Sequence, residues 1–218
     1  MALDYELSVE NIKQHLEAAH DPILAIIRGQ FFDAEWAFFR KNIFDQRVLV
    51  AGSGLGHDSF ELAKYNKQVL GIELLEPLVE YSKNKLEELG LTNVSFEVGD
   101  ITHLDFLHDK FDSAILNMGT IGNFDDKKKI ISELLKVSDK VYFDFYLTTE
   151  TCLEKRKRMY AEEKWINVRI EKFRIMSDDG LDSVPIYPAG IDSIVSSLGA
   201  KVKYHQFHEF SVMVEIEK

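Results

Sequence analysis

The sequence contains one cysteine, Cys152, in 218 residues. A single cysteine excludes an internal disulfide. No apolar run is long enough to cross a bilayer, and no charged segment followed by an apolar one opens the chain as a secretory leader would. We therefore expect a cytoplasmic protein with no membrane partner, organised as one α/β domain large enough to bury its own core.

Positive charge is also scarce, because 26 Lys and Arg residues face 37 Asp and Glu residues, for a formal net charge of −11. A field of this sign repels the phosphates of nucleic acids. We expect no nucleic-acid partner, and we expect neutral or cationic small molecules to be favoured.

A glycine-rich turn follows the first strongly apolar run, residues 47–50, and precedes a helical pattern that begins at Ser59. Because Gly52, Gly54 and Gly56 have no side chains, the backbone can adopt positive φ and let a ligand approach closely. The free N–H groups of the following helix add partial positive charge. The pattern predicts a ligand-binding loop between a strand and a helix.

The spacing of these glycines excludes two common loops. A dinucleotide fingerprint needs a third glycine at the sixth position, where this chain has His57. A P-loop would need a Gly-Lys-Ser/Thr ending, which is absent. His57 could contact a ligand, although a surface position in the first helical turn is the simpler expectation.

Polar side chains end the next three apolar runs. Glu73 ends the second, about twenty residues after the first glycine, where doubly wound folds place a carboxylate on ribose hydroxyls. Asp100 ends the third, over 94–100, and Asn117 ends the fourth, over 111–117. The carboxyl ends of parallel strands meet at one edge, so these side chains should gather at one site.

This ordered set, over residues 47–146, resembles the class I S-adenosylmethionine-dependent methyltransferases. The resemblance implies a Rossmann-like α/β fold: a mostly parallel seven-stranded sheet with helices on both faces and a C-terminal antiparallel hairpin. It implies S-adenosylmethionine as cofactor and S-adenosylhomocysteine as product. One departure is Val50, which stands two residues before the first glycine, where most members are acidic.

The resemblance also implies which residues bind the cofactor. Glu73 would accept both ribose hydroxyls, Asp100 would face the adenine amino group, and Arg28 would meet the cofactor's carboxylate. The predicted cofactor site consists of Arg28, Gly52, Ser53, Gly54, Gly56, Glu73, Leu74, Asp100, Ile101, Asn117 and Met118.

Methyl transfer from a sulfonium is an in-line displacement that requires positioning in a dry pocket more than a strong base. The predicted acceptor-positioning residues are Asn117, Asn123, Asp144, Tyr146 and Tyr187. Small-molecule members, similar to glycine N-methyltransferases and thiol methyltransferases, share the Gly56-x-Asp58 continuation, and segment 118–124 resembles a loop of small-molecule N-methyltransferases. We therefore expect a small-molecule acceptor, with nitrogen favoured. The alternatives are a non-catalytic cofactor-binding module, a protein methyltransferase and, less favoured, an NAD(P)-dependent oxidoreductase.

The chain divides into four expected parts: an N-terminal helical cap (1–46), a cofactor-binding core (47–146), an insertion that covers the acceptor (147–187), and a terminal helix and hairpin (188–218). In the cap, Asp21 and Pro22 would open a helix over 23–44 that weakens at Gly29. That helix could pack on the sheet edge or cover the cofactor, so either it or the insertion could be the lid.

Further elements are expected from periodicity and caps. They are helices over 76–90, from 125 onward, over 154–164 and over 188–199, and strands over 141–146, 165–170, 173–175, 201–207 and 211–217.

Two remaining patterns predict no site of their own. His205 and His208, three apart on an expected strand, would face opposite sides, so we propose no metal site. The basic run 155–158 is typical of a solvated helix face, with selection of an anionic substrate as the alternative.

Overall fold

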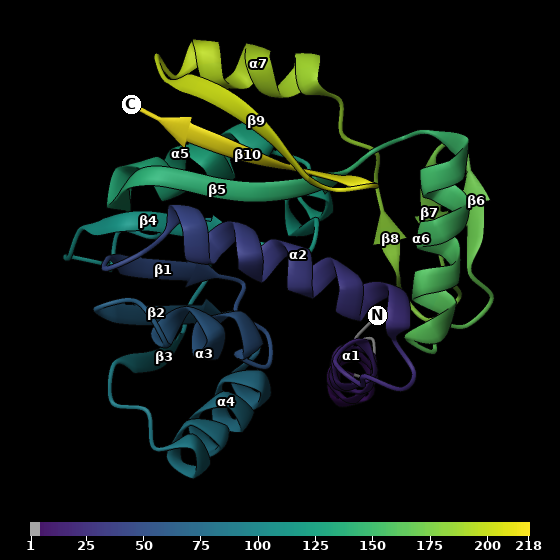
Figure 1. Cartoon of the computed structure of the whole chain (residues 1–218), viewed down its shortest axis with the longest axis horizontal. Helices are drawn as coiled ribbons and strands as arrows, with labels where there is room; N and C mark the ends of the chain where they lie inside the picture. The colour runs from purple at the N-terminus through teal and green to yellow at the C-terminus, as the bar shows by residue number, and fades with distance from the viewer. Residues whose placement is uncertain (1–4) are drawn as a thin grey trace.

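A seven-stranded sheet forms the centre of the computed structural model, which describes residues 5–218 and, from residue 9 onward, their side chains (Figure 1). Its order is β3-β2-β1-β4-β5-β10-β9, with β10 antiparallel to both of its neighbours and the other pairs of the core parallel. The predicted fold class is confirmed. The strands are β1 (Arg47–Ala51), β2 (Gln68–Glu73), β3 (Val94–Val98), β4 (Phe111–Leu116), β5 (Ser138–Tyr146), β9 (Lys201–His208) and β10 (Ser211–Glu217).

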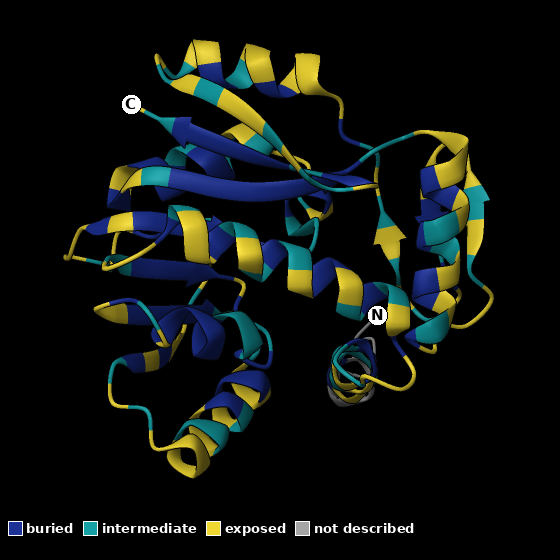
Figure 2. Cartoon of the chain, in the orientation of Figure 1, coloured by how far each residue is buried: buried dark blue, intermediate teal, exposed yellow. Residues whose placement is uncertain are grey.

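Helices cover both faces of this sheet. α2 (Ile26–Asn42), α3 (His57–Ala63) and α4 (Glu76–Leu89) pack on one face, and α5 (Lys127–Val137) and α7 (Pro188–Ser197) pack on the other. Figure 2 shows the central strands buried almost along their whole length. Because both faces are covered, these strands read as continuous apolar runs without alternation.

Several predicted boundaries agree closely with the structure. α4 ends at Leu89, and the following Gly90 caps it in the left-handed conformation with φ 62°. The Asp126 side chain caps α5 by accepting a hydrogen bond from the Lys129 amide at 2.9 Å. β5 begins at Ser138, three residues before the predicted start at 141. None of the described helices is long and apolar enough to cross a membrane.

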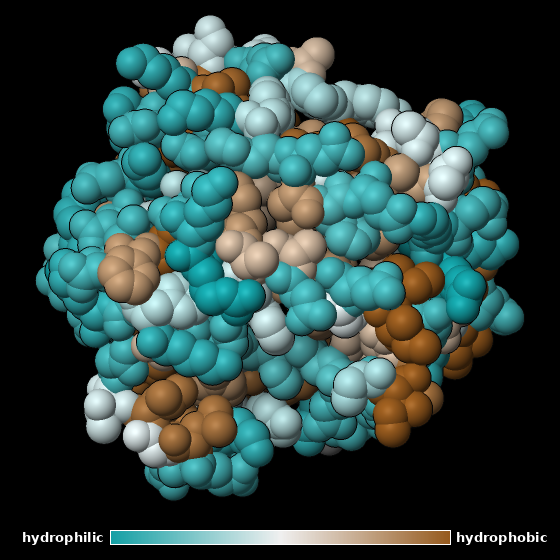
Figure 3. All heavy atoms as spheres, in the orientation of Figure 1, coloured by the Kyte–Doolittle hydropathy of each residue, from teal (hydrophilic) through white to brown (hydrophobic). Residues whose placement is uncertain are grey.

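The helix predicted over 23–44 is shorter in the structure. The carboxylate of Asp21 accepts hydrogen bonds from the amides of Ile23 (2.8 Å) and Leu24 (3.1 Å), so it caps a separate turn and α2 starts at Ile26. α2 continues through Gly29 without a break, and the Gly29 amide donates a helical hydrogen bond to the Ala25 carbonyl (2.8 Å). The turn leaves Ile23, Leu24 and Ile26 exposed, and hydrophobic surface gathers at this corner of a mostly hydrophilic face (Figure 3).

The segment 147–187 forms a helix and a small sheet beside the main one. α6 (Glu150–Glu162) starts four residues before the predicted helix, because Thr149 caps it by accepting from the Cys152 amide. β6 (Arg169–Glu171), β7 (Arg174–Met176) and β8 (Asp182–Ser183) follow as an antiparallel sheet. The strand predicted over 165–170 is only three residues long, since positive φ at Lys164 and Asn167 turns the chain before it.

Two further elements border the same end of the sheet. α1 (Tyr5–Ala19) lies beside the start of α2 and near segment 147–187, where Figure 1 shows it end-on. A single 3₁₀ turn, η1 (Thr120–Asn123), follows β4. Residues 1–4 of the expected N-terminal cap lie outside the described residues.

Candidate active site

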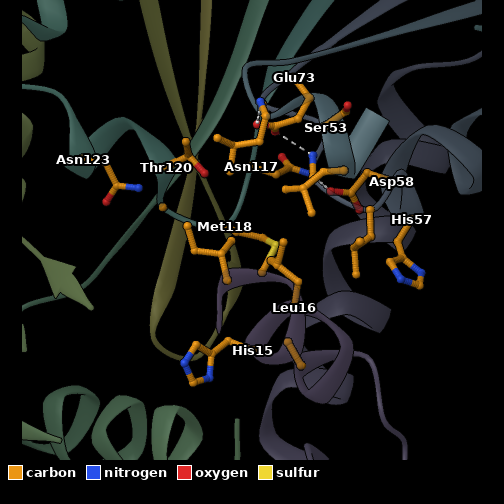
Figure 4. A pocket seen from close by; sticks show the side chains of 18 of the residues that line it. His15, Leu16, Ser53, His57, Asp58, Glu73, Asn117, Met118, Thr120 and Asn123 are labelled. Carbon is orange, nitrogen blue, oxygen red and sulfur yellow. Dashed lines mark hydrogen bonds between the residues drawn. The ribbon is translucent and has the colours of Figure 1, made fainter. Parts of the chain in front are cut away.

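A cavity of about 440 Å³ opens at the carboxyl ends of β1, β2 and β4 (Figure 4). Its volume lies in the range of small-molecule and cofactor sites. α1, the start of α2, the loop with η1, and the segment from α6 to β8 complete its wall. The predicted site residues that line it are Arg28, Gly52, Ser53, Gly54, Glu73, Leu74, Asp100, Ile101, Asn117, Met118 and Asn123.

The glycine loop and Glu73 hold each other in place. Gly52, Gly54 and Gly56 all have positive φ, as predicted (69°, 52° and 82°). The Glu73 carboxylate accepts from the Gly54 amide at 3.0 Å and from the Leu75 amide at 3.1 Å (Figure 4). Each carboxylate oxygen has two lone pairs, so both oxygens keep capacity for a ligand hydroxyl.

Gly56 does not line the cavity. It is the left-handed residue that precedes α3, and a Cβ there would lie 2.8 Å from the Phe96 ring. The requirement for glycine at this position therefore comes from the turn and from packing, and not from direct contact with the cavity.

Asp100 lies at the rim, exposed to solvent. Its carboxylate accepts from the Thr102 amide at 2.8 Å and faces His103 Nδ1 at 3.4 Å. The Thr102 hydrogen bonds hold the pKa of Asp100 below its ordinary value, so the group is anionic at neutral pH. The next residue, Ile101, is buried and adds an apolar wall.

Asn117 is fixed at the floor of the cavity by Asp58. Its Nδ2 donates to Asp58 Oδ2 at 2.9 Å, and Asp58 Oδ1 accepts from Trp36 Nε1 at 2.8 Å. Its other amide atom, Oδ1, is buried and has no partner among residues 9–218, and the same holds for Oγ of Ser53. Buried polar atoms are rarely left unpaired, so these two oxygens fit a site whose ligand supplies donors.

Asp144 was predicted to position an acceptor, and the structure places it outside the cavity lining. Its fully buried carboxylate accepts from the Gly119 amide at 2.7 Å and from Ser211 Oγ at 3.3 Å. Burial raises the pKa of Asp144 to about 6, against the opposing effect of the Gly119 hydrogen bond. Asp144 therefore holds the loop after β4 in place.

Tyr146 and Tyr187 also lie outside the lining. The Tyr146 hydroxyl accepts from Arg28 Nη1 at 2.7 Å within a fully buried cluster. Tyr187 is 53% exposed and precedes the first turn of α7. The positions of these two tyrosines depend on how segment 147–187 and α7 pack in the folded chain. Local sequence does not show that packing.

The charge of Arg28 is already compensated. Its Nε donates to Glu163 Oε1 at 2.6 Å, and both side chains are almost completely buried. The other oxygen, Glu163 Oε2, accepts from Trp165 Nε1 at 3.2 Å. Burial by itself would lower the pKa of Arg28, but the Glu163 carboxylate raises it well above the ordinary value.

His57 and His20 stack at the cavity wall, with ring centroids 3.5 Å apart. Burial lowers the pKa of each imidazole to about 4, so both rings are neutral at pH 7. His57 is therefore part of the cavity and not a surface residue of the first turn. The histidines of β9 behave differently: His205 pairs with Glu215 at 2.9 Å, and His208 packs edge-on against Phe210.

Sequence reasoning missed the cavity residues His15, Glu163 and Ser183, and it missed the buried carboxyl group of Glu35. Neither carboxyl oxygen of Glu35 has a hydrogen-bond partner among the side chains that the structure describes, and burial raises its pKa well above the ordinary value. In the sequence, Glu35 stands among phenylalanines in the apolar helical stripe of 23–44. A carboxyl group in such a stripe was the signal that could have indicated its burial.

Local sequence similarity connects the chain with protein-L-isoaspartate O-methyltransferases. The protein of this name from Dictyoglomus turgidum is 41% identical over 58 residues, or 27% of this chain and 26% of that protein. The one from Petrotoga mobilis is 46% identical over 55 residues, or 25% of this chain and 26% of the relative. The chain thus matches only about a quarter of the length of these relatives.

Solved structures share the fold over most of the chain. The magnesium protoporphyrin IX methyltransferase from Synechocystis PCC 6803, with bound S-adenosylhomocysteine, has a TM-score of 0.63 at 21% identity and covers 87% of this chain and 82% of its own. A SAM-dependent methyltransferase from Aquifex aeolicus has a TM-score of 0.61 at 16% identity, covering 84% and 88%. Identities this low indicate a shared fold.

The family model described as a methyltransferase domain matches residues 45–167, which is more than half of the chain and includes the glycine loop, Glu73, Asp100 and Asn117. The chain therefore belongs to the methyltransferase domain family, and the class I methyltransferase fold expected from its sequence is confirmed.

Proposed function

We propose that this protein transfers the methyl group of S-adenosylmethionine to a small-molecule acceptor. The observation that carries the proposal is the continuity of the cavity, which runs from the Gly54–Glu73 pair to a wall made by α1 and segment 147–187. One continuous cavity can thus hold a cofactor against the glycine loop and an acceptor beside α1 and segment 147–187.

The chain's own residues fit the cofactor. Glu73 would accept the ribose hydroxyls with its remaining lone pairs, and Asp100 would accept from the adenine amino group at the rim. The unpartnered oxygens of Ser53 and Asn117 would accept from the cofactor's donors. When bound, S-adenosylmethionine supplies a methyl group activated by the positive sulfonium.

The remaining lining would hold the acceptor. Met118, Thr120, Asn123 and Phe124 from the loop after β4 face the cavity together with Tyr160 from α6. The apolar members of this set exclude water, and the Asn123 amide can orient a polar group. We propose nitrogen as the methylated atom because segment 118–124 resembles the loop of small-molecule N-methyltransferases.

We propose that the four parts of the chain have distinct roles. Residues 1–46 and 147–187 would cover the site, 47–146 would bind the cofactor, and 188–218 would complete the sheet. The cover favours a small acceptor, since α1 and segment 147–187 contact each other through His15, which also lines the cavity.

A protein acceptor is the second candidate, and the local identity to protein-L-isoaspartate O-methyltransferases favours it. Incubation with methyl-labelled cofactor, a metabolite extract and a protein lysate distinguishes the two. We expect label in the small-molecule fraction, whereas label only in protein would support the second candidate. Gly54→Val is the matched control, because any side chain at this left-handed position (φ 52°) strains the glycine loop that would hold the cofactor.

A further inference from the structure

A buried arginine, Arg156, lies behind the acceptor side of the cavity. It is 1% exposed, so the expectation that the whole basic run 155–158 forms a solvated helix face is wrong for Arg156. The structure confirms solvent contact for Lys155 and Arg158, which pair with Glu209 and with Glu162. Arg156 instead points into the protein.

Arg156 has no carboxylate partner. Among residues 9–218, no acidic oxygen lies within 4.0 Å of its guanidinium, and its Nε has no hydrogen-bond partner. The nearby carboxylate of Glu163 is already engaged by Arg28 and Trp165. The Tyr146 ring, 4.2 Å from the guanidinium carbon, compensates part of the charge. A buried charge without an ionic partner is otherwise costly.

Ser183 connects this charge to the cavity. Arg156 Nη2 donates to Ser183 Oγ at 2.5 Å, and Ser183 lines the cavity from β8. A guanidinium has no acceptor, so the Ser183 hydroxyl hydrogen cannot be donated back to it. The hydroxyl hydrogen is therefore free to donate toward the cavity, and the positive charge behind it strengthens that donor.

We propose that Ser183, backed by Arg156, forms a subsite for an oxyanion on the acceptor, either a carboxylate or a phosphonate-type group. One positive charge without an ionic partner matches one negative group, which would explain why a buried arginine stands at position 156. The proposal rests on the proposed function, because it takes this side of the cavity as the acceptor site.

Three matched probes test the subsite without turnover: propionate, ethylphosphonate and the neutral isostere propionamide. Their binding to the protein saturated with S-adenosylhomocysteine is measured by ligand-observed NMR titration. We expect the anions to bind and propionamide to bind at least about tenfold more weakly. The tighter of the two anions identifies the oxyanion. Equal binding of propionamide and both anions would overturn the proposal.

Substitutions at Arg156 and Ser183 test whether the anions bind at this subsite. Arg156→Met keeps most of the side-chain volume, and Ser183→Ala removes only the hydroxyl; each should weaken anion binding roughly 10- to 100-fold. Lys155→Met, which removes the same charge from the exposed side of α6, should leave it unchanged. Unchanged anion affinity in both site variants, or equal loss in Lys155→Met, would contradict the subsite. If Arg156→Met does not fold, the anion affinity of Ser183→Ala still tests the subsite.

Two further readouts distinguish an anion subsite from a purely structural arginine and from a lost cofactor site. S-adenosylhomocysteine affinity should be the same in all variants, and a wild-type protein that does not bind it would contradict the proposed function independently of the anion result.

The melting temperature of Arg156→Met without ligand should be no lower than that of wild type, because a buried charge without an ionic partner is gone. A melting temperature lowered by several degrees with full anion affinity would show a structural arginine only.

Discussion

The imidazole of His15 stacks on the indole of Trp165, with ring centroids 3.7 Å apart and planes 17° from parallel. Its Nδ1 lies 3.0 Å from the Glu163 carbonyl oxygen, and its Nε2 lies 3.0 Å from Asp179 Oδ2. Through this one side chain α1 is fixed to segment 147–187. We infer that α1 and segment 147–187 cover the cavity together. The helix expected over 23–44 as an alternative lid is α2, which packs on the sheet and lines the cavity only through Arg28.

Replacing His15 should loosen that cover. His15→Leu removes the stack and both polar contacts, at a cost of about 1–3 kcal/mol of stability. We expect faster hydrogen exchange across α1 and a lower melting temperature. Gln14→Leu, on the exposed side of the same helix, is the control and should leave exchange unchanged. Equal exchange in His15→Leu and wild type would show that α1 is held by other contacts.

Glu73 should control cofactor affinity. Hydrogen bonds to a charged group contribute roughly 1.5–3 kcal/mol each, so Glu73→Ala should weaken S-adenosylhomocysteine binding on the order of tenfold to several hundredfold by calorimetry. Glu76→Ala, an exposed carboxylate in the first turn of α4, is the control. Near-wild-type affinity in Glu73→Ala would remove Glu73 from the cofactor site.

Asp144 should stabilise the fold through the Gly119 amide. Asp144→Ala leaves that buried donor unpaired and should cost about 1–3 kcal/mol in urea unfolding. Asp144→Asn keeps an acceptor oxygen and should cost clearly less, because burial already disfavours the ionised form. If both variants lost the same stability, the hydrogen bond to Gly119 would not be the reason.

Glu35 should make stability depend on pH. Burial, with Asp58 and Asp144 nearby, raises the pKa of Glu35 well above its ordinary 4.5. The folded state then keeps a proton that the unfolded state releases, so the free energy of unfolding falls as pH rises above 4.5, by at most ~1.4 kcal/mol per pH unit.

Glu35→Gln removes this titration. Measured by urea unfolding, the variant should gain stability relative to wild type between pH 5 and pH 7.5. Asp33→Asn, an exposed carboxylate on the same helix, should show no such trend. A loss in Glu35→Gln that was the same at both pH values would mean that the carboxyl group contributes through a fixed contact.

The deletion of segment 147–187 would be a poor test of its covering role. Met159, Ile175 and Leu153 of this segment are buried in one cluster with Phe31 and Phe210. Removing it would expose that cluster, so point substitutions at His15 and Ser183 are the sharper experiments.

The sequence by itself determined the features whose signals are local. These features are the glycine loop, Glu73, Asp100 and Asn117, each of which directly follows an apolar strand. Because parallel strands end at one edge of the sheet, these residues could be expected to lie together. Helix caps such as Gly90 and Asp126 are equally local, because the capping side chain or the left-handed residue acts within one turn.

Only the tertiary structure decided which side chains beyond this edge reach the cavity. Arg28 and Glu163 are 135 residues apart, and nothing in either neighbourhood predicts their pairing. β5 is buried on both faces, so its apolar run gave no sign that Asp144 and Tyr146 face the packed interior. The burial of Arg156 depends on how α6 packs against α2 and β6. A helix shows its buried face only through an apolar stripe, and a charged residue interrupts that stripe.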